Sequence, residues 1–239
     1  MKTVFHPSDS RGYANHGWLE ARHSFSFANW HQPDRLHFGA LRVLNDDIIR
    51  GGMGFGTHPH DNMEIVTIPL KGELEHKDSM GNTAVIREGD IQVMSAGTGV
   101  QHSEYNNNPD QEINLFQLWL FPNKRNVTPR YDQLPISSLH QKNIFFQILS
   151  PSASDQGVWI HQDAWMHMLD ADLGQSLDYD LKSQDYGVYI IVIEGEVDVG
   201  DKTLSRRDAI GVWETKKVEL KTKSNSKLLL VQVPMLQLN

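Results

Sequence analysis

The sequence predicts an all-β protein made of two barrel-like domains packed together. Three observations lead to this fold class. Short alternating or apolar runs recur every 8–12 residues or so, roughly the spacing found in sandwiches and barrels, and Gly, Asn and Asp turns separate them. The chain has 239 residues, enough for one large or two ordinary domains. The two halves also show a faint internal repeat: an apolar run, a glycine and an alternating run follow one another around Gly72 and again around Gly195.

We expect the first domain to span residues 1–130. Its strands are predicted where β-branched and aromatic residues alternate with polar ones. In chain order these strands are His23–Phe27, Phe38–Asn45, Ile48–Arg50, Glu64–Leu70, Glu73–Asp78, Thr83–Ile86, Ile91–Met94, Val100–Tyr105 and Ile113–Phe121. A turn is predicted at Asn45-Asp46-Asp47, because Asn and Asp favour turns.

The second domain is expected at residues 131–239. Residues 122–142 contain three prolines and little strand pattern, which indicates a linker with a short helical turn at Ile136–His140. The strands predicted after it are Ile144–Leu149, Val158–Gln162, Trp165–Leu169, Val188–Glu194, Glu196–Gly200, Ala209–Trp213, Lys216–Lys221 and Lys227–Val233.

Composition excludes several classes of protein. An apolar content of 39% with 22% charged residues is typical of a folded chain. The net charge of −8, without a Lys/Arg cluster, argues against direct nucleic-acid binding. No apolar run reaches the roughly 18 residues of a membrane helix, and the first residues form no signal peptide, so we expect a cytoplasmic protein. We also expect it to be a monomer. Cysteine is absent, so no thiolate can bind a metal.

Two histidines two residues apart give the first candidate site, in Thr57-His58-Pro59-His60. Side chains alternate faces in an extended chain, so His58 and His60 point to the same side. Pro59 favours the extended conformation. Neutral imidazoles that converge in this way often begin a metal site. The alternative is a polar surface loop that happens to carry histidines.

A second pair, His102 and Glu104, shares one face of the predicted strand Val100–Tyr105. If both pairs line one barrel, three imidazole nitrogens and one carboxylate oxygen converge. This set suits Fe(II), Cu(II), Ni(II), Mn(II) or Zn(II) and is close to the sites of two-His-one-carboxylate oxygenases. The alternatives are a core histidine and a solvated glutamate. Glu64 is a competing carboxylate, or a group that orients an imidazole.

Longer motifs carry a family resemblance. Gly52-x5-His58-x-His60-x3-Glu64-x7-Gly72 resembles the first motif of the cupin superfamily, with one extra residue before its last Gly. Gly89 to Asn106 resembles the second, with Ser95 where Pro is usual. The stretches similar to the pirin family are Thr57-His58-Pro59-His60, Met94-Ser95-Ala96-Gly97-Thr98-Gly99 and Gln101-His102-Ser103-Glu104. Residues 11–18 are similar to bacterial pirin-like proteins that act as quercetin 2,3-dioxygenases, and the resemblance covers most of residues 10–235.

The resemblance implies an all-β bicupin, with two jelly-roll-like β-barrel domains and a metal in the N-terminal barrel only. The implied ligands are His58, His60, His102 and Glu104, and Glu64 is implied not to bind the metal. The expected ion is Fe(II), with Cu, Ni, Co, Mn or Zn as alternatives. The C-terminal barrel lacks both pairs, which is consistent with a structural or interaction role.

The implied activity is a metal-dependent dioxygenase that cleaves flavonols such as quercetin and releases carbon monoxide. Its partners would be a flat aromatic substrate and dioxygen, and Glu104 would act as the catalytic base. Phe38, Phe55 and Trp119 could form an apolar wall for the substrate, or belong to the plain core. The alternatives are a metal-dependent regulatory module that modulates a protein partner, and another cupin reaction such as isomerisation.

Overall fold

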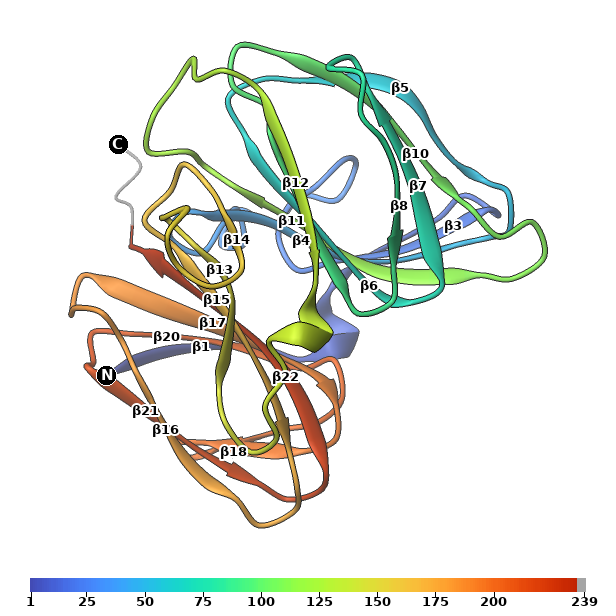
Figure 1. The fold of residues 1–239 in the computed structure, drawn as a ribbon. Coiled ribbons are helices and arrows are strands. Elements are labelled where there is room, and N and C mark those ends of the chain that lie inside the picture. Colours follow the sequence, from blue (N-terminus) through green and yellow to red (C-terminus); the bar gives the residue numbers. More distant parts are fainter. Residues whose placement is uncertain (236–239) are drawn as a thin grey trace.

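The chain folds into two lobes made almost entirely of β-strands (Figure 1). The computed structural model describes residues 1–235, so the last four residues of the predicted second domain lie outside the described part. Each lobe combines a seven-stranded sheet with a four-stranded sheet. The predicted all-β, two-domain fold is therefore confirmed. Within residues 1–235, no helix has the length and apolarity needed to cross a membrane.

The N-terminal lobe holds the segments that carry both candidate pairs. In spatial order its seven-stranded sheet contains β12 (Arg130–Pro135), β9 (Asp90–Ser95), β6 (Glu64–Lys71), β11 (Ile113–Leu120), β4 (Leu41–Ile49), β3 (Leu19–His23) and β2 (Gly12–Asn15). Its four-stranded sheet contains β5 (Gly54–His60), β10 (Val100–Asn106), β7 (Glu73–Asp78) and β8 (Thr83–Arg87). Two short 3-10 helices, η1 (Ser8–Ser10) and η2 (Ile136–Ser138), lie outside the sheets.

The C-terminal lobe repeats this arrangement. Its seven-stranded sheet contains β1 (Lys2–His6), β20 (Ala209–Trp213), β17 (Tyr186–Glu194), β22 (Ser226–Pro234), β15 (Trp165–Ala171), β13 (Phe146–Ser150) and β14 (Val158–Trp159). Its four-stranded sheet contains β16 (Ser176–Asp180), β21 (Lys217–Thr222), β18 (Val197–Val199) and β19 (Lys202–Leu204).

Strand pairing crosses the predicted division at residue 130 in two places. β1 pairs with β20, so the first strand of the chain belongs to the C-terminal sheet, where Figure 1 shows it in blue. β12 pairs with β9, so residues 130–135 extend the N-terminal sheet. The exact division stays a prediction. The pairing places β1 in the C-terminal sheet and β12 in the N-terminal sheet, whereas the division at residue 130 would assign β1 to the first domain and most of β12 to the second.

The two seven-stranded sheets share the largest apolar core. Alternate residues of β6 and β11, such as Val66 and Phe116, lie in one buried cluster with alternate residues of β17 and β22, such as Tyr189 and Leu229. The remaining apolar residues of β17 and β22 fill the interior of the C-terminal lobe. Both faces of these strands are therefore buried, which explains why residues 188–193 form a continuous apolar run.

The interiors of the two lobes differ in chemistry. Sixteen buried aliphatic and aromatic side chains fill the C-terminal interior, and the first and last of them in the chain are Leu169 and Leu230. In the N-terminal lobe the interior holds two smaller apolar clusters together with buried polar residues, which include Asn45, Asp47 and His102. The N-terminal interior is thus the one equipped for polar chemistry.

The predicted turn at Asn45-Asp46-Asp47 is wrong, because these residues continue β4 without a break. The side chains of Asn45 and Asp46 find partners on distant parts of the chain, whereas Asp47 Oδ1 is buried without a hydrogen-bond partner among residues 1–235. His23 Nδ1 lies 2.9 Å from Asn45 Oδ1, and Arg207 of the C-terminal lobe forms an ion pair of 2.9 Å with Asp46. Turn-forming residues can occupy a strand when tertiary contacts satisfy their polar groups.

Two other assignments also differ from the prediction. The alternating segment His23–Phe27 is not a strand, since β3 ends at His23, although Phe25 is buried. The predicted linker contains β12 as well as the expected helical turn, which is observed at Ile136–Ser138. Strands that the pattern did not reveal are Lys2–His6, Gly12–Asn15, Leu19–His23, Gly54–His60, Ser176–Asp180 and Lys202–Leu204.

Candidate metal centre

Antiparallel pairing of β5 with β10 brings the two candidate pairs together. The register places His102 opposite His58 and Val100 opposite His60, and an irregularity follows between His102 and Glu104. The ring centroids lie 4.9 Å apart for His58 and His60, 4.4 Å for His58 and His102, and 4.9 Å for His60 and His102. One ring nitrogen from each histidine lies within 4.8 Å of the others, a geometry that could hold a metal ion.

Hydrogen bonding leaves free nitrogen lone pairs at this cluster. His58 Nδ1 lies 2.8 Å from the carbonyl oxygen of Gly56. A carbonyl only accepts, so Nδ1 carries the proton and Nε2 of His58 presents a lone pair. Nε2 of His102 is buried and has no hydrogen-bond partner among the described residues. A buried nitrogen without a partner is costly, and a metal ion would satisfy it. The cluster therefore fits a divalent transition metal.

The pKa values of two of these imidazoles also suit metal binding. Burial, helped by His102 and His58, lowers the pKa of His60 to about 4. Burial, helped by His58 and His76, lowers the pKa of His102 to about 3. Both rings are neutral at pH 7, as a metal ligand must be, so a metal would not have to displace a proton from either ring at that pH.

Glu104 lies at the edge of the histidine cluster and is buried. Gln117 Nε2 donates to both carboxylate oxygens, at 3.2 and 3.0 Å. One oxygen of Glu104 and one ring nitrogen each of His76 and His102 lie within 4.8 Å of one another. Ring nitrogens of His58, His60 and His102 form a second group of this kind. The four predicted donors thus belong to two overlapping triads that share His102.

His76 is a neighbour that the sequence analysis did not single out. It lies on β7, where Glu104 is its partner across the strands. Its Nε2 lies 3.2 Å from Asp78 Oδ2, and its Nδ1 lies 3.5 Å from His102 Nδ1. Since a carboxylate accepts, Nε2 of His76 is the donor and its Nδ1 accepts from His102. This chain of contacts keeps Nε2 of His102 unprotonated. His76 and Asp78 are two residues apart on one strand face, so the alternation argument could have found them.

Replacing His76 with phenylalanine should weaken metal binding without removing it. The ring shape is kept, but His102 loses the acceptor that fixes its tautomer. Loss of such an outer partner typically lowers metal affinity about 10–100-fold. Competition titration against a chelator would measure the change, with exposed His31 replaced by phenylalanine as the control. An affinity equal to that of the unaltered protein would show that His76 does not orient His102.

A cavity of about 200 Å³ opens beside the cluster. His58, His60 and Glu104 reach it, and it is lined further by Leu19, Ala21, His23, Phe27, Asn45, Asp47, Phe55, Gln117 and Trp119. Of the three aromatic residues expected at a substrate wall, Phe55 and Trp119 line the cavity, and Trp119 packs edge-on against His60. Phe38 does not, because it packs against Tyr189 and Trp213 of the C-terminal lobe.

Asp47 adds a second buried carboxyl group to the cavity wall. Burial, followed by the nearby charges of Asp46 and Glu104, raises its pKa well above the usual range. Gln117 and Asp47 come from the seven-stranded sheet, on β11 and β4, and face the four-stranded sheet that carries the histidines. Sequence reasoning missed both, because Gln117 stands alone in an apolar run and Asp47 had been assigned to a turn.

Glu64 points away from the metal centre. It begins β6, whose residues Val66 and Ile68 belong to the core between the lobes, and alternation places Glu64 on that same face. Ser95 Oγ donates to its carboxylate at 2.7 Å, and Glu64 is absent from both potential metal groups among the described residues. The implication that Glu64 is not a ligand agrees with this position, and it does not contact the imidazoles as an orienting group either.

Replacing Glu64 with glutamine should change the pH dependence of stability. Burial raises the pKa of Glu64 to about 7, despite the hydrogen bond from Ser95. The folded state therefore binds this proton more tightly than the unfolded state, and its contribution to stability is lost as the pH rises from about 4.5 to 7. Relative to the unaltered protein, the free energy of unfolding of the variant should rise between pH 5 and pH 8, by up to about 3 kcal/mol.

Urea denaturation at both pH values would measure this effect, with exposed Glu88 replaced by glutamine as the control. An equal difference from the unaltered protein at pH 5 and pH 8 would mean that Glu64 titrates normally.

Comparison with known proteins places this site in a family. The Pirin family model matches residues 4–120, and the model of the quercetinase C-terminal cupin domain matches residues 147–233. A protein named quercetin 2,3-dioxygenase from Escherichia coli K12 is 40% identical over 227 residues, which cover 95% of this chain and 96% of that protein. The chain belongs to the pirin family. The resemblance inferred from its motifs is confirmed.

Other pirins share the whole fold. The pirin-like protein of Caulobacter vibrioides is 35% identical over 94% of this chain and 97% of its own. The crystal structure of YhhW from Escherichia coli superimposes with a TM-score of 0.94 at 37% identity and covers 100% of both chains. A second structure, of YhhW in complex with nickel(II), gives a TM-score of 0.93 at 37% identity and covers 98% of this chain and 100% of that one. Both lobes of this chain therefore have counterparts in a solved bacterial pirin.

Proposed function

We propose that this pirin is a metal-dependent dioxygenase that cleaves flavonols such as quercetin and releases carbon monoxide. The observation that carries the proposal is the convergence of three imidazoles, with the partnerless Nε2 of His102, beside a cavity with aromatic walls. The name of the relative from Escherichia coli, quercetin 2,3-dioxygenase, supports the substrate class.

The residues proposed to hold the metal are His58, His60, His102 and Glu104. Nitrogen and oxygen donors of this kind suit Fe(II), our proposed ion, and also Ni(II), Cu(II), Co(II), Mn(II) and Zn(II). Ni(II) is the main alternative, because YhhW has been solved in complex with nickel(II). When bound, such an ion acts as a Lewis acid and lowers the pKa of a hydroxyl group that it coordinates.

The size of the cavity limits how a flavonol can bind. Its volume of about 200 Å³ is below the 300–1,000 Å³ or so of pockets that enclose a drug-sized ligand. The edge of the flavonol's central ring, which carries the 3-hydroxyl and the 4-carbonyl, would enter the cavity while the outer rings lie towards the mouth. Phe55 and Trp119 would contact the flat ring, and their apolar surface would limit the access of water.

Glu104 is the base that we propose for the 3-hydroxyl proton. The two hydrogen bonds from Gln117 hold its carboxylate at the cavity wall, which favours a fixed geometry for proton transfer. Burial raises the pKa of Asp47 on the same wall well above its usual range, which favours its neutral form.

Metal analysis paired with a quercetin assay tests the proposal. The protein would be purified without chelators or added metals, its metal content measured, and quercetin supplied with and without air. We expect one divalent ion per chain, turnover only with dioxygen, and carbon monoxide in step with quercetin loss. Turnover without dioxygen would instead indicate another cupin reaction, such as isomerisation. Capture of a protein partner without quercetin turnover would indicate a regulatory module.

A further inference from the structure

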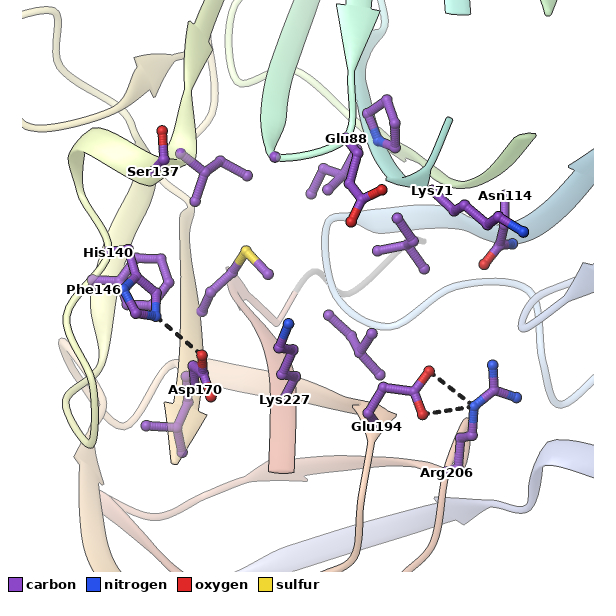
Figure 2. Close-up of a pocket in the computed structure, with 18 of the residues that line it drawn as sticks. Lys71, Glu88, Asn114, Ser137, His140, Phe146, Asp170, Glu194, Arg206 and Lys227 are labelled. Atoms are coloured by element: carbon purple, nitrogen blue, oxygen red, sulfur yellow. Dashed lines mark hydrogen bonds and ion pairs between the residues drawn. The ribbon is translucent and has the colours of Figure 1, made fainter. Parts of the chain in front are cut away.

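A second and larger cavity, of about 670 Å³, lies between the two lobes (Figure 2). Residues of β6, β11 and the β8–β9 turn form one wall, and residues of β15, β17 and β22 form the other. It shares no lining residue with the cavity at the metal centre. Its volume falls within the range of about 300–1,000 Å³ that is typical of small-molecule sites.

Apolar side chains form much of this cavity's surface. Those that line it are Ile68, Leu70, Ile136, Phe146, Met168 and Ile193. Phe146 packs edge-on against His140, with ring centroids 5.3 Å apart, and so presents an aromatic surface held in place. Met168 is only partly buried and adapts easily to a flat ring, since thioethers make favourable contacts with aromatic groups. The surface therefore suits an aromatic body.

Charged groups stand on the two opposite walls. Figure 2 shows the ammonium group of Lys227 and the carboxylate of Glu88 directed into the open space. Neither forms an ion pair or a side-chain hydrogen bond within residues 1–235, and the same holds for Lys71 at the rim. A ligand could therefore supply partners for all three.

The other charges of the cavity already have partners. Arg206 donates to both oxygens of Glu194, at 3.0 and 2.9 Å, and Arg207 is paired with Asp46. Asp170 is held by His140 and by Lys142, at 3.1 and 2.7 Å. The charges without such partners among residues 1–235 are thus Lys71, Lys227 and Glu88, a net charge of +1, which matches a singly charged carboxylate better than a phosphate group of charge near −2.

We propose that the cavity between the lobes binds a small aromatic carboxylate that also carries a hydroxyl group. The carboxylate lies at Lys227, with Lys71 as a second cation, and the ring lies against Phe146 and Met168. The hydroxyl group donates to Glu88 on the opposite wall. This site is separate from the metal centre and does not depend on the proposed dioxygenase activity.

Fluorescence titration of the metal-loaded protein with 6-hydroxy-2-naphthoate tests the proposal. This probe has a hydroxyl group and a carboxylate at opposite ends of two fused rings. We expect saturable binding that weakens about tenfold with 2-naphthol, which lacks the carboxylate, and several-fold with 2-naphthoate, which lacks the hydroxyl group. Lys227→Gln should weaken binding of the hydroxynaphthoate by about tenfold but leave the affinity for 2-naphthol unchanged.

Further variants distinguish this cavity from other sites. Lys221→Gln, at an exposed lysine of the same lobe outside the cavity, should bind like the unaltered protein. Met168→Trp, which narrows the cavity beside Phe146 where the ring lies, should weaken binding by about tenfold or more, and thermal unfolding would confirm that each variant is folded. His58→Ala, which alters the metal centre, should leave this binding intact even if the protein proves not to be a dioxygenase. The proposal would be overturned if the hydroxynaphthoate showed no saturable binding, or if the folded Lys227→Gln and Met168→Trp variants bound it as tightly as the unaltered protein does. Loss of binding with His58→Ala would also overturn it.

Discussion

His58→Ala should remove the metal and the dioxygenase activity together. His58 contributes one of three converging imidazoles, and its Nδ1 is bound to Gly56, so only Nε2 can serve a metal. Loss of an outer partner already lowers metal affinity about 10–100-fold, so loss of a direct ligand should lower it by more than about 100-fold. Quercetin turnover and carbon monoxide release should fall in proportion to the metal content.

The fold should survive this change, because His58 is half-exposed on β5. A truncation at such a position usually alters the free energy of unfolding by no more than about 0.5 kcal/mol in the metal-free protein. His31→Ala, at an exposed loop position, is the matched control and should keep both metal and activity. Full activity in a metal-depleted His58→Ala protein would refute the proposed mechanism.

Glu104→Gln should reduce turnover strongly while part of the metal is retained. The three imidazoles remain, but the amide is a poor base and a weaker ligand than the carboxylate. Loss of a positioned general base typically costs about 100- to 10,000-fold in rate. Gln117 can still donate to the amide oxygen of the new side chain, so the local packing should hold. Turnover would be measured at equal metal occupancy, so that any effect on binding of the ion is removed.

Glu75→Gln provides the control for this experiment. Glu75 lies on the neighbouring strand β7 and pairs with Lys77 at the surface, so its loss should leave turnover unchanged. If Glu104→Gln turned quercetin over at the normal rate per bound metal, another group would have to accept the proton, and Glu104 would be at most a ligand.

The seven-stranded sheet of the N-terminal lobe serves two sites with its two faces. On β11, Gln117 and Trp119 face the metal centre, whereas Asn114 faces the cavity between the lobes. Asn114 also donates to Asp46 at 2.7 Å and to the backbone carbonyl of Asp47 at 3.1 Å. The same alternation that builds the metal centre on one face therefore builds the larger cavity on the other.

The sequence by itself determined the all-β fold class and the two pairs of the candidate metal centre. Alternation of side chains is a local property of an extended chain, so spacing alone placed His58 with His60 and His102 with Glu104. The same local rule could have found His76 and Asp78. It also explains why Glu64 faces the other lobe once the direction of β6 is known.

Only the tertiary structure decided which of these faces meet. The register of β5 against β10 set His102 opposite His58, and no local pattern specifies that register. Asn45 and Asp46 fit within a strand because partners as distant as Arg207 satisfy their buried side chains, and the first strand joined the C-terminal sheet through pairing with β20. Each of these outcomes depends on hydrogen bonds and burial between segments far apart in the chain, which local propensity cannot specify.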